Sequence, residues 1–192
     1  MRPAFRLFGC LCLCLAVLSG PPAAAQEAPA KAAVCAGCHG ENGVPTGPLV
    51  PVIWGQEFYY LYVQLRDFAA GRRKSEVMTP IAEELSKDDM KALAGWFSKQ
   101  TWPTIRHEVP SDAQTAEALK FDTAGQCSAC HLGGFNGNSR VPRLAGQTAS
   151  YLLQTMTAFR DKTRLNAPDM NNIMAGSSDE TLAATAAYIS AR

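Results

Sequence analysis

A five-residue pattern, C-x-x-C-H, occurs twice in this 192-residue chain and limits its possible folds more than any other feature. The cysteines of the two copies are Cys35, Cys38, Cys127 and Cys130, and the histidines are His39 and His131. Paired cysteines could form disulfides or hold a zinc ion, but neither use requires a histidine directly after each pair. Covalent attachment of haem requires it, because the thiols bond to the macrocycle while the imidazole ligates the iron. The pattern therefore predicts two covalently bound haem c groups.

The likeness between the two halves continues beyond this pattern. Segment 51–56 recurs as 142–147, and the Tyr-Leu pair at 60–61 recurs at 151–152, with the register shifted by 91 or 92 positions. An internal repeat of this length indicates two homologous domains in tandem, joined here by a segment that has two prolines and no helical period. The expected divisions are a first domain at residues 26–100, a linker at 101–110 and a second domain at 111–192.

The periodicity of apolar residues predicts an all-α fold, because no convincing run of alternating apolar and polar residues argues for a strand. We expect one helix over residues 59–70, ended by Gly71, and its copy over 151–159. The last helix of each domain should begin at a capping box, in which a serine hydroxyl and an acidic side chain three residues later satisfy free amide groups. The expected boxes are Ser86 with Asp89 and Ser177 with Glu180.

The first residues of the chain are typical of a secretory signal peptide. Arg2 and Arg6 precede an apolar run that ends at Leu18, and small residues follow up to Ala25. We therefore expect cleavage after residue 25 and export to the periplasm; the apolar run is too short for a membrane anchor. Whether the exported protein also associates with the membrane stays open. The 18 basic and 17 acidic residues nearly balance, and no basic stripe suggests nucleic acid as a partner.

The iron ligands can be proposed by comparing the two repeats. His39 and His131 provide one ligand each, and the opposite ligand should be a soft thioether from methionine. Met78 and Met170 each lie 39 residues after their histidine, in segments that we expect to be loops. The other methionines of the exported chain, Met90, Met156 and Met174, align with apolar core positions, although Met174 remains an alternative to Met170 because it lies in the same segment. His107 has no counterpart in the other repeat and is interpreted as a solvated linker residue.

These residues resemble the two-haem class I cytochromes c of the cytochrome c4 type over essentially residues 26–192. The resemblance rests on both C-x-x-C-H segments, on the repeated Gly-Gln-x-x-x-Tyr-Leu segment and on the segment 67–73. It implies two tandem class I cytochrome c domains related by internal duplication. It also implies that the carbonyls of Pro51 and Pro142 accept hydrogen bonds from the proximal imidazoles, and that Arg73 and Arg164 lie near the haem propionates. The second copy departs from the pattern at Leu132, which replaces a glycine.

The expected function is single-electron relay rather than catalysis, because iron with two protein ligands has no open position for a substrate. The partners of such a carrier would be a donor dehydrogenase or quinol-oxidising complex and an acceptor oxidase or reductase. One alternative is a cytochrome subunit of a larger dehydrogenase, such as flavocytochrome c sulfide dehydrogenase, which would require a flavoprotein subunit. A second alternative, a di-haem peroxidase, would need one exchangeable sixth ligand, which the paired methionines argue against.

Overall fold

The computed structural model describes residues 27–192, so the predicted signal peptide lies outside the described part of the chain. Helices account for the regular structure of this part, apart from an isolated bridge between Asn138 and Val141. The helices are α1 (Ala32–His39), α2 (Phe58–Ala69), α3 (Met78–Glu83), α4 (Lys87–Phe97), α5 (Asp112–Gly125), α6 (Cys127–His131), α7 (Ala149–Arg160), α8 (Pro168–Met174) and α9 (Asp179–Ser190). The all-α prediction is confirmed. Of the helices in residues 27–192, none is both long and apolar enough to cross a membrane.

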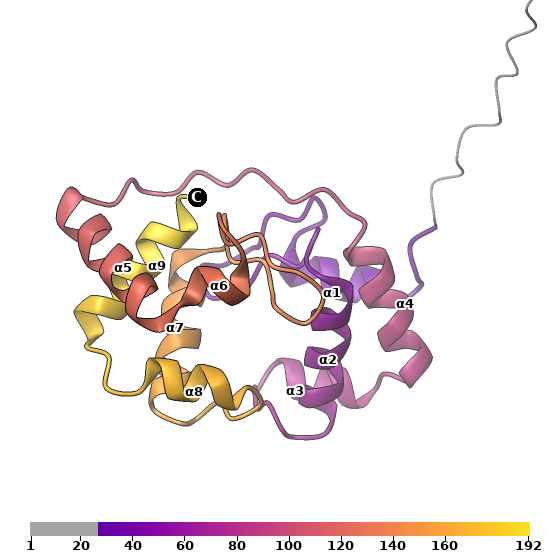
Figure 1. Cartoon of the computed structure of the whole chain (residues 1–192). Coiled ribbons are helices and arrows are strands. Elements are labelled where there is room, and N and C mark those ends of the chain that lie inside the picture. Colours follow the sequence, from indigo (N-terminus) through magenta and orange to yellow (C-terminus); the bar gives the residue numbers. More distant parts are fainter. Residues whose placement is uncertain (1–26) are drawn as a thin grey trace, which may run out of the picture.

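The helices form two groups that lie side by side (Figure 1). In the first group α2 packs against α3 and α4, and in the second α7 packs against α8 and α9. This equivalence follows the sequence repeat, because the two sets of helices come from matched segments. Helix α5 adds a further layer on α9 in the second group. Between α4 and α5 the backbone is extended, without regular secondary structure, and runs along one edge of both groups (Figure 1).

Helix α2 begins and ends within one residue of its predicted bounds, and α4 begins at the predicted capping box. Helix α2 ends where Gly71 takes a positive φ of 66° and its amide donates to the Phe68 carbonyl at 3.0 Å. Helix α4 begins at a complete capping box: the Asp89 amide donates to the Ser86 hydroxyl at 3.1 Å, and the Ser86 amide donates to the Asp89 carboxylate at 2.9 Å. Such a cap contributes about 1 kcal/mol to stability.

The predicted cap of the last helix is wrong by one residue. Ser178, not Ser177, precedes α9, and its hydroxyl accepts from the Thr181 amide at 3.2 Å. The Ser177 hydroxyl donates instead to the Met174 carbonyl at 2.9 Å, and its amide bonds to the same carbonyl. Ser177 therefore caps the C-terminal end of α8, and the adjacent Ser178 caps the N-terminal end of α9.

Two apolar cores lie under these helices. In the described residues of the first group the cluster of buried core residues is Ala32, Leu61, Leu93, Ala94 and Phe97. The cluster of the second group is larger: α7 contributes Leu152, Met156 and Phe159, and Phe135 adds its ring from the loop after α6. Leu93 in α4 and Leu182 in α9 are almost completely buried, at 1% and 0% exposure.

Trp102 of the linker packs against one glycine in each group, Gly55 and Gly146. A Cβ on Gly55 would lie 3.0 Å from the Trp102 amide nitrogen, and one on Gly146 would lie 2.9 Å from its indole nitrogen. Both glycines have positive φ, 67° and 72°, so a larger residue is disfavoured at both positions for two reasons. The repeated glycine of the Gly-Gln segment is thus required by the close approach of the linker.

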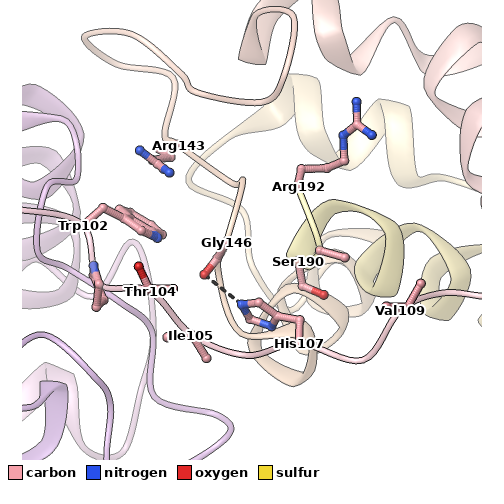
Figure 2. Close-up of a pocket in the computed structure, with 11 residues that line it drawn as sticks. Trp102, Thr104, Ile105, His107, Val109, Arg143, Gly146, Ser190 and Arg192 are labelled. Carbon is pink, nitrogen blue, oxygen red and sulfur yellow. Dashed lines mark hydrogen bonds between the residues drawn. The ribbon is translucent and has the colours of Figure 1, made fainter.

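The linker also lines a pocket of about 340 Å³ beside the end of α9 (Figure 2). In Figure 2 the His107 ring points toward the Gly146 carbonyl, to which its Nε2 atom lies at 3.2 Å. His107 is half-buried, so its interpretation as a solvated residue is wrong. The Arg143 guanidinium stacks over the Trp102 ring at 4.5 Å and holds the linker to the second group.

Candidate haem-binding sites

Each C-x-x-C-H segment occupies about one turn of helix. Cys35 and Cys38 lie in α1, and Cys127 and Cys130 lie in α6. All four cysteines are free thiols. Burial raises the pKa of Cys35, and burial together with the nearby Asp122 carboxylate raises the pKa of Cys127 to about 11. The chain therefore presents two pairs of cysteines that form no disulfide, each pair directly followed by an imidazole.

The two histidines lie in matching environments. Each is 6% exposed, and each Nδ1 atom is held by a proline carbonyl, His39 by Pro51 at 2.7 Å and His131 by Pro142 at 2.9 Å. Burial lowers the pKa of both imidazoles more than these hydrogen bonds raise it. A neutral imidazole that donates from Nδ1 leaves the Nε2 lone pair free, which is the form that ligates a metal.

The two methionines predicted as ligands lie in short helices, not in the expected loops. Met78 is the first residue of α3, where the Ser75 hydroxyl accepts its amide at 3.1 Å. Met170 lies in the first turn of α8, which begins at Pro168, a residue suited to the first position of a helix. Both methionines are half-buried.

The other methionines of the described chain belong to the cores. Met90 is 5% exposed, Met156 is 6% and Met174 is 2%. Met174 packs with Leu182 in the core cluster of the second group, whereas Met170 lies at the edge of that cluster. This placement favours Met170 over Met174 as a ligand, because a ligand must leave the core to face a bound group.

Arg73 and Arg164 converge where the two groups meet. Each guanidinium stacks on the phenylalanine of its own repeat, Arg73 on Phe68 at 4.5 Å and Arg164 on Phe159 at 4.4 Å. Both donate to the same acceptor, the Gln64 side-chain oxygen, at 2.9 and 3.0 Å. Arg73 also donates to the Tyr151 hydroxyl at 3.0 Å, so it bonds across the interface.

This interface favours an anion. The Nη1 atom of Arg164 is buried and has no hydrogen-bond partner among the described residues. Burial raises the pKa of the Tyr151 hydroxyl, but the positive charges of Arg73 and Arg164 outweigh burial and lower the pKa below its ordinary value. A buried donor without a partner in a positive field suits the carboxylates of haem propionates. With the free thiols and the oriented imidazoles, the residues present fit a c-type haem in each group.

Sequence reasoning missed the polar residues that join the two groups. The carboxylate of Asp67 accepts from the Asn166 amide at 3.0 Å across the interface, and from Arg66 and Arg72 beside it. Burial raises the pKa of Asp67, but these hydrogen bonds outweigh it and lower the pKa. No repeat signal could have identified this site, because the repeat position of Asp67 holds Ala158.

Two glutamines, Gln56 and Gln147, make a second set of interface bonds, and sequence reasoning assigned them no role. The Gln147 amide accepts from the Val52 amide at 2.8 Å and donates to the Val52 carbonyl at 3.0 Å. Gln56 makes the same pair of bonds to the backbone of Arg143, at 2.8 and 3.0 Å. The glutamines are 3% and 2% exposed. A signal was present here, because both glutamines belong to the repeated Gly-Gln segment.

Comparison with known proteins gives relatives along most of the chain, although a scan of protein-family profiles finds no match. The chain is 34% identical to cytochrome c4 from Azotobacter vinelandii over an alignment that covers 91% of this chain and 90% of the relative. Its fold is similar to the solved structure of Acidithiobacillus ferrooxidans cytochrome c4, with a TM-score of 0.74 and 30% identity, covering 83% of this chain and 99% of the other.

Two further similarities concern proteins of thiosulfate oxidation. The chain is 32% identical to a thiosulfate dehydrogenase electron acceptor from Stutzerimonas stutzeri, covering 82% of this chain and 78% of the relative. It is also similar to part of a solved thiosulfate dehydrogenase from Marichromatium purpuratum, with a TM-score of 0.72 and 31% identity. That match covers 81% of this chain and 36% of the other.

Proposed function

Starting from the fact that this chain belongs to the cytochrome c4 family, whose members carry electrons on two covalently bound haem c groups, we propose which residues hold those groups. The attachment residues are Cys35 and Cys38 in the first domain and Cys127 and Cys130 in the second. The axial iron ligands are His39 and Met78 in the first domain and His131 and Met170 in the second. The domains extend over residues 26–100 and 111–192, with the linker at 101–110.

The observation that carries this assignment is the paired orientation of the histidines. His39 and His131 are buried, neutral, and held at Nδ1 by a proline carbonyl, at 2.7 and 2.9 Å. Only Nε2 is then available to an iron atom, and a fixed ring needs no reorganisation when the charge on the iron changes. When bound, each haem supplies one-electron redox chemistry, and the chain supplies attachment, axial ligands and a polar setting.

Arg73 and Arg164 would partner the haem propionates at the domain interface. Their guanidiniums are kept in place by stacking on Phe68 and Phe159, and a second interaction with Gln64 brings them together. Positive charge at this point offsets the propionate charges and keeps the interface from carrying a buried excess of anions. The two haems are thereby held at one interface within a single chain.

For the cellular role we propose a periplasmic electron carrier that receives single electrons from a donor dehydrogenase and delivers them to an acceptor oxidase or reductase. The resemblance to a thiosulfate dehydrogenase electron acceptor supports a dehydrogenase that oxidises a reduced sulfur compound as the donor. The competing hypothesis is a permanent subunit of a dehydrogenase, with or without a flavoprotein subunit. Native mass and flavin content of the protein from its own cells, isolated without detergent, distinguish the two: a flavin-free single chain with two haems supports the free carrier.

The methionine assignment is tested by three alanine variants. Met78→Ala and Met170→Ala each remove a thioether ligand, so one of the two reduction potentials should fall and the reduced protein should bind carbon monoxide. Met174→Ala is the control: it should cost about 2 to 5 kcal/mol of stability through a core cavity and leave both potentials in place. Voltammetry and carbon monoxide titration give the answer; a potential that falls in Met174→Ala and not in Met170→Ala would reverse the assignment in the second domain.

A further inference from the structure

Gln147 and the proximal histidine of the other domain act on the same peptide group. The peptide bond between Pro51 and Val52 has its carbonyl on Pro51 and its N–H on Val52. The carbonyl accepts the hydrogen bond from His39 Nδ1 at 2.7 Å, and the N–H donates to Gln147 Oε1 at 2.8 Å. A continuous chain of hydrogen bonds therefore runs from the amide of the second domain to the imidazole of the first.

The equivalent arrangement surrounds His131 in the second domain. The peptide bond between Pro142 and Arg143 accepts from His131 Nδ1 at 2.9 Å and donates to Gln56 Oε1 at 2.8 Å. Each glutamine also donates back to the carbonyl of the residue that it bonds, so its amide cannot rotate away. The two chains of hydrogen bonds cross the interface in opposite directions.

We propose that Gln56 and Gln147 are positioning residues through which each domain sets the reduction potential of the haem in the other domain. This inference rests on the proposed function, because it needs His39 and His131 to be iron ligands. It gives a physical reason for the glutamine in both repeats: the amide is part of the ligand environment of the neighbouring haem and also an interface contact.

The physical basis is polarisation along the hydrogen-bonded chain. A peptide N–H that donates to an amide oxygen places more negative charge on its own carbonyl, which then accepts more strongly from the imidazole. A stronger hydrogen bond from Nδ1–H to this carbonyl places more negative charge on the imidazole ring and makes Nε2 a more basic ligand. A more basic ligand favours ferric iron and lowers the reduction potential. The glutamines are 3% and 2% exposed, so water does not screen the effect.

The two chains of hydrogen bonds differ in burial, so we expect the two glutamines to change the reduction potentials by different amounts. The bonds between Gln147 and Val52 are fully buried, and Val52 itself is 1% exposed. The bonds between Gln56 and Arg143 are only partly buried. The first-domain haem should therefore depend more on Gln147 than the second-domain haem depends on Gln56.

The test uses the intact two-haem protein and the variants Gln147→Leu and Gln56→Leu. Gln147→Leu should raise the first-domain potential and leave the second-domain potential in place, and Gln56→Leu should do the reverse by a smaller amount. The first-domain wave in voltammetry is identified as the one that falls in Met78→Ala. Gln154→Leu, an exposed glutamine on α7, is the matched control and should shift neither wave.

A purely structural role of the glutamines gives a different pattern. If they only hold the domains together, both leucine variants loosen the same interface and shift the same waves, which would overturn the proposal. Gln147→Glu keeps an oxygen acceptor for the Val52 amide, so the first-domain potential should not rise in that variant; a rise equal to that in Gln147→Leu would also overturn it.

Amide hydrogen exchange gives a readout independent of the potentials. The Val52 amide should exchange faster in Gln147→Leu than in the parent protein or in Gln154→Leu, and unchanged exchange would contradict the buried bond. Failure of this inference is distinguishable from failure of the haem assignment. Two attached haems with both waves unmoved in the glutamine variants would refute the inference alone, whereas methionine variants that leave both waves unmoved would refute the ligand assignment.

Discussion

The two domains share the residues that we propose hold haem, but their apolar cores differ in size. The core cluster of the second domain contains eleven buried residues, and that of the first contains five, counted over residues 27–192. Helix α7 contributes three of the eleven residues, whereas its counterpart α2 contributes one of the five. The second domain also has α5, a fourteen-residue helix that packs along α9 before the second C-x-x-C-H segment begins. In the described part of the first domain no separate helix precedes the C-x-x-C-H segment, which lies within the eight-residue α1. A domain with a smaller core should depend more on the apolar surface that its cofactor buries.

The domains also differ in the polar groups that they bring to their shared face. The first domain supplies acceptors, Gln64 and Asp67, and the second supplies donors, Arg164 and Asn166. At the matched positions of the second domain stand Thr155 and Ala158. The C-x-x-C-H segments and the interface bonds of Gln56 and Gln147 are thus duplicated. The bonds of Arg164 and Asn166 to Gln64 and Asp67 have no duplicate and join complementary side chains.

The largest effect should follow removal of haem attachment, domain by domain. Cys35→Ser with Cys38→Ser, and Cys127→Ser with Cys130→Ser, should each reduce the mass by one haem, measured by mass spectrometry. Because the first domain has the smaller described core, its variant should lose more helix, measured by far-UV circular dichroism and thermal unfolding. Equal loss of helix in the two variants would show that core size does not decide the dependence on haem.

A smaller effect should come from the residue that follows each proximal histidine. Gly40 has φ 90°, and a Cβ there would lie 2.0 Å from the Val44 carbonyl oxygen; Leu132 occupies the matched position with φ 65°. Gly40→Ala should therefore lower the free energy of unfolding by more than about 1 kcal/mol. Leu132→Gly should raise it by about 1 kcal/mol, because Leu132 is held in a conformation that favours glycine. Denaturant unfolding measures both, and destabilisation by Leu132→Gly would contradict the strain argument.

The smallest effect concerns the carboxylate at the interface. Asp67→Ala should cost about 1 kcal/mol, since the Asn166 amide loses one of its two acceptors and keeps its bond to Gln64. Arg66 and Arg72 are about half exposed and contribute little. The folded pKa of Asp67 lies below its ordinary value of 3.8, so its stabilisation is complete above about pH 4 and is lost as the pH falls through the folded pKa. Acid unfolding of the variant should begin at higher pH than in the parent.

The control for this last prediction is Asp88→Ala, because the Asp88 side chain is 93% exposed and, within residues 27–192, forms an ion pair with Lys91 alone. It should leave the free energy of unfolding within about 0.5 kcal/mol of the parent. If Asp67→Ala and Asp88→Ala had the same acid transition, the interface carboxylate would not contribute as described.

Sequence comparison within the chain predicted the haem class, the duplicated helices and the positions of the core methionines. These succeed because covalent attachment requires fixed spacing within one helical turn, and because a repeat exposes each required residue twice. The relatives confirm two tandem class I cytochrome c domains with two covalent haem c groups. Predictions failed where the outcome depended on local contacts that residue spacing does not show. The last helix is capped by Ser178 instead of the predicted Ser177, and Met78 and Met170 lie in short helices instead of the predicted loops.

The sequence by itself determined the cofactor chemistry and the duplicated plan, since thiols, imidazoles and thioethers at repeated spacing carry that chemistry in their order along the chain. Only the tertiary structure decided how the halves meet. Gln147 reaches Val52 across 95 positions, and Asn166 reaches Asp67 across 99. Such bonds depend on the angle at which two folded domains dock, and on the linker that presses Trp102 against both glycines. The docking geometry depends on the total free energy of many weak long-range contacts, which no local sequence pattern predicts.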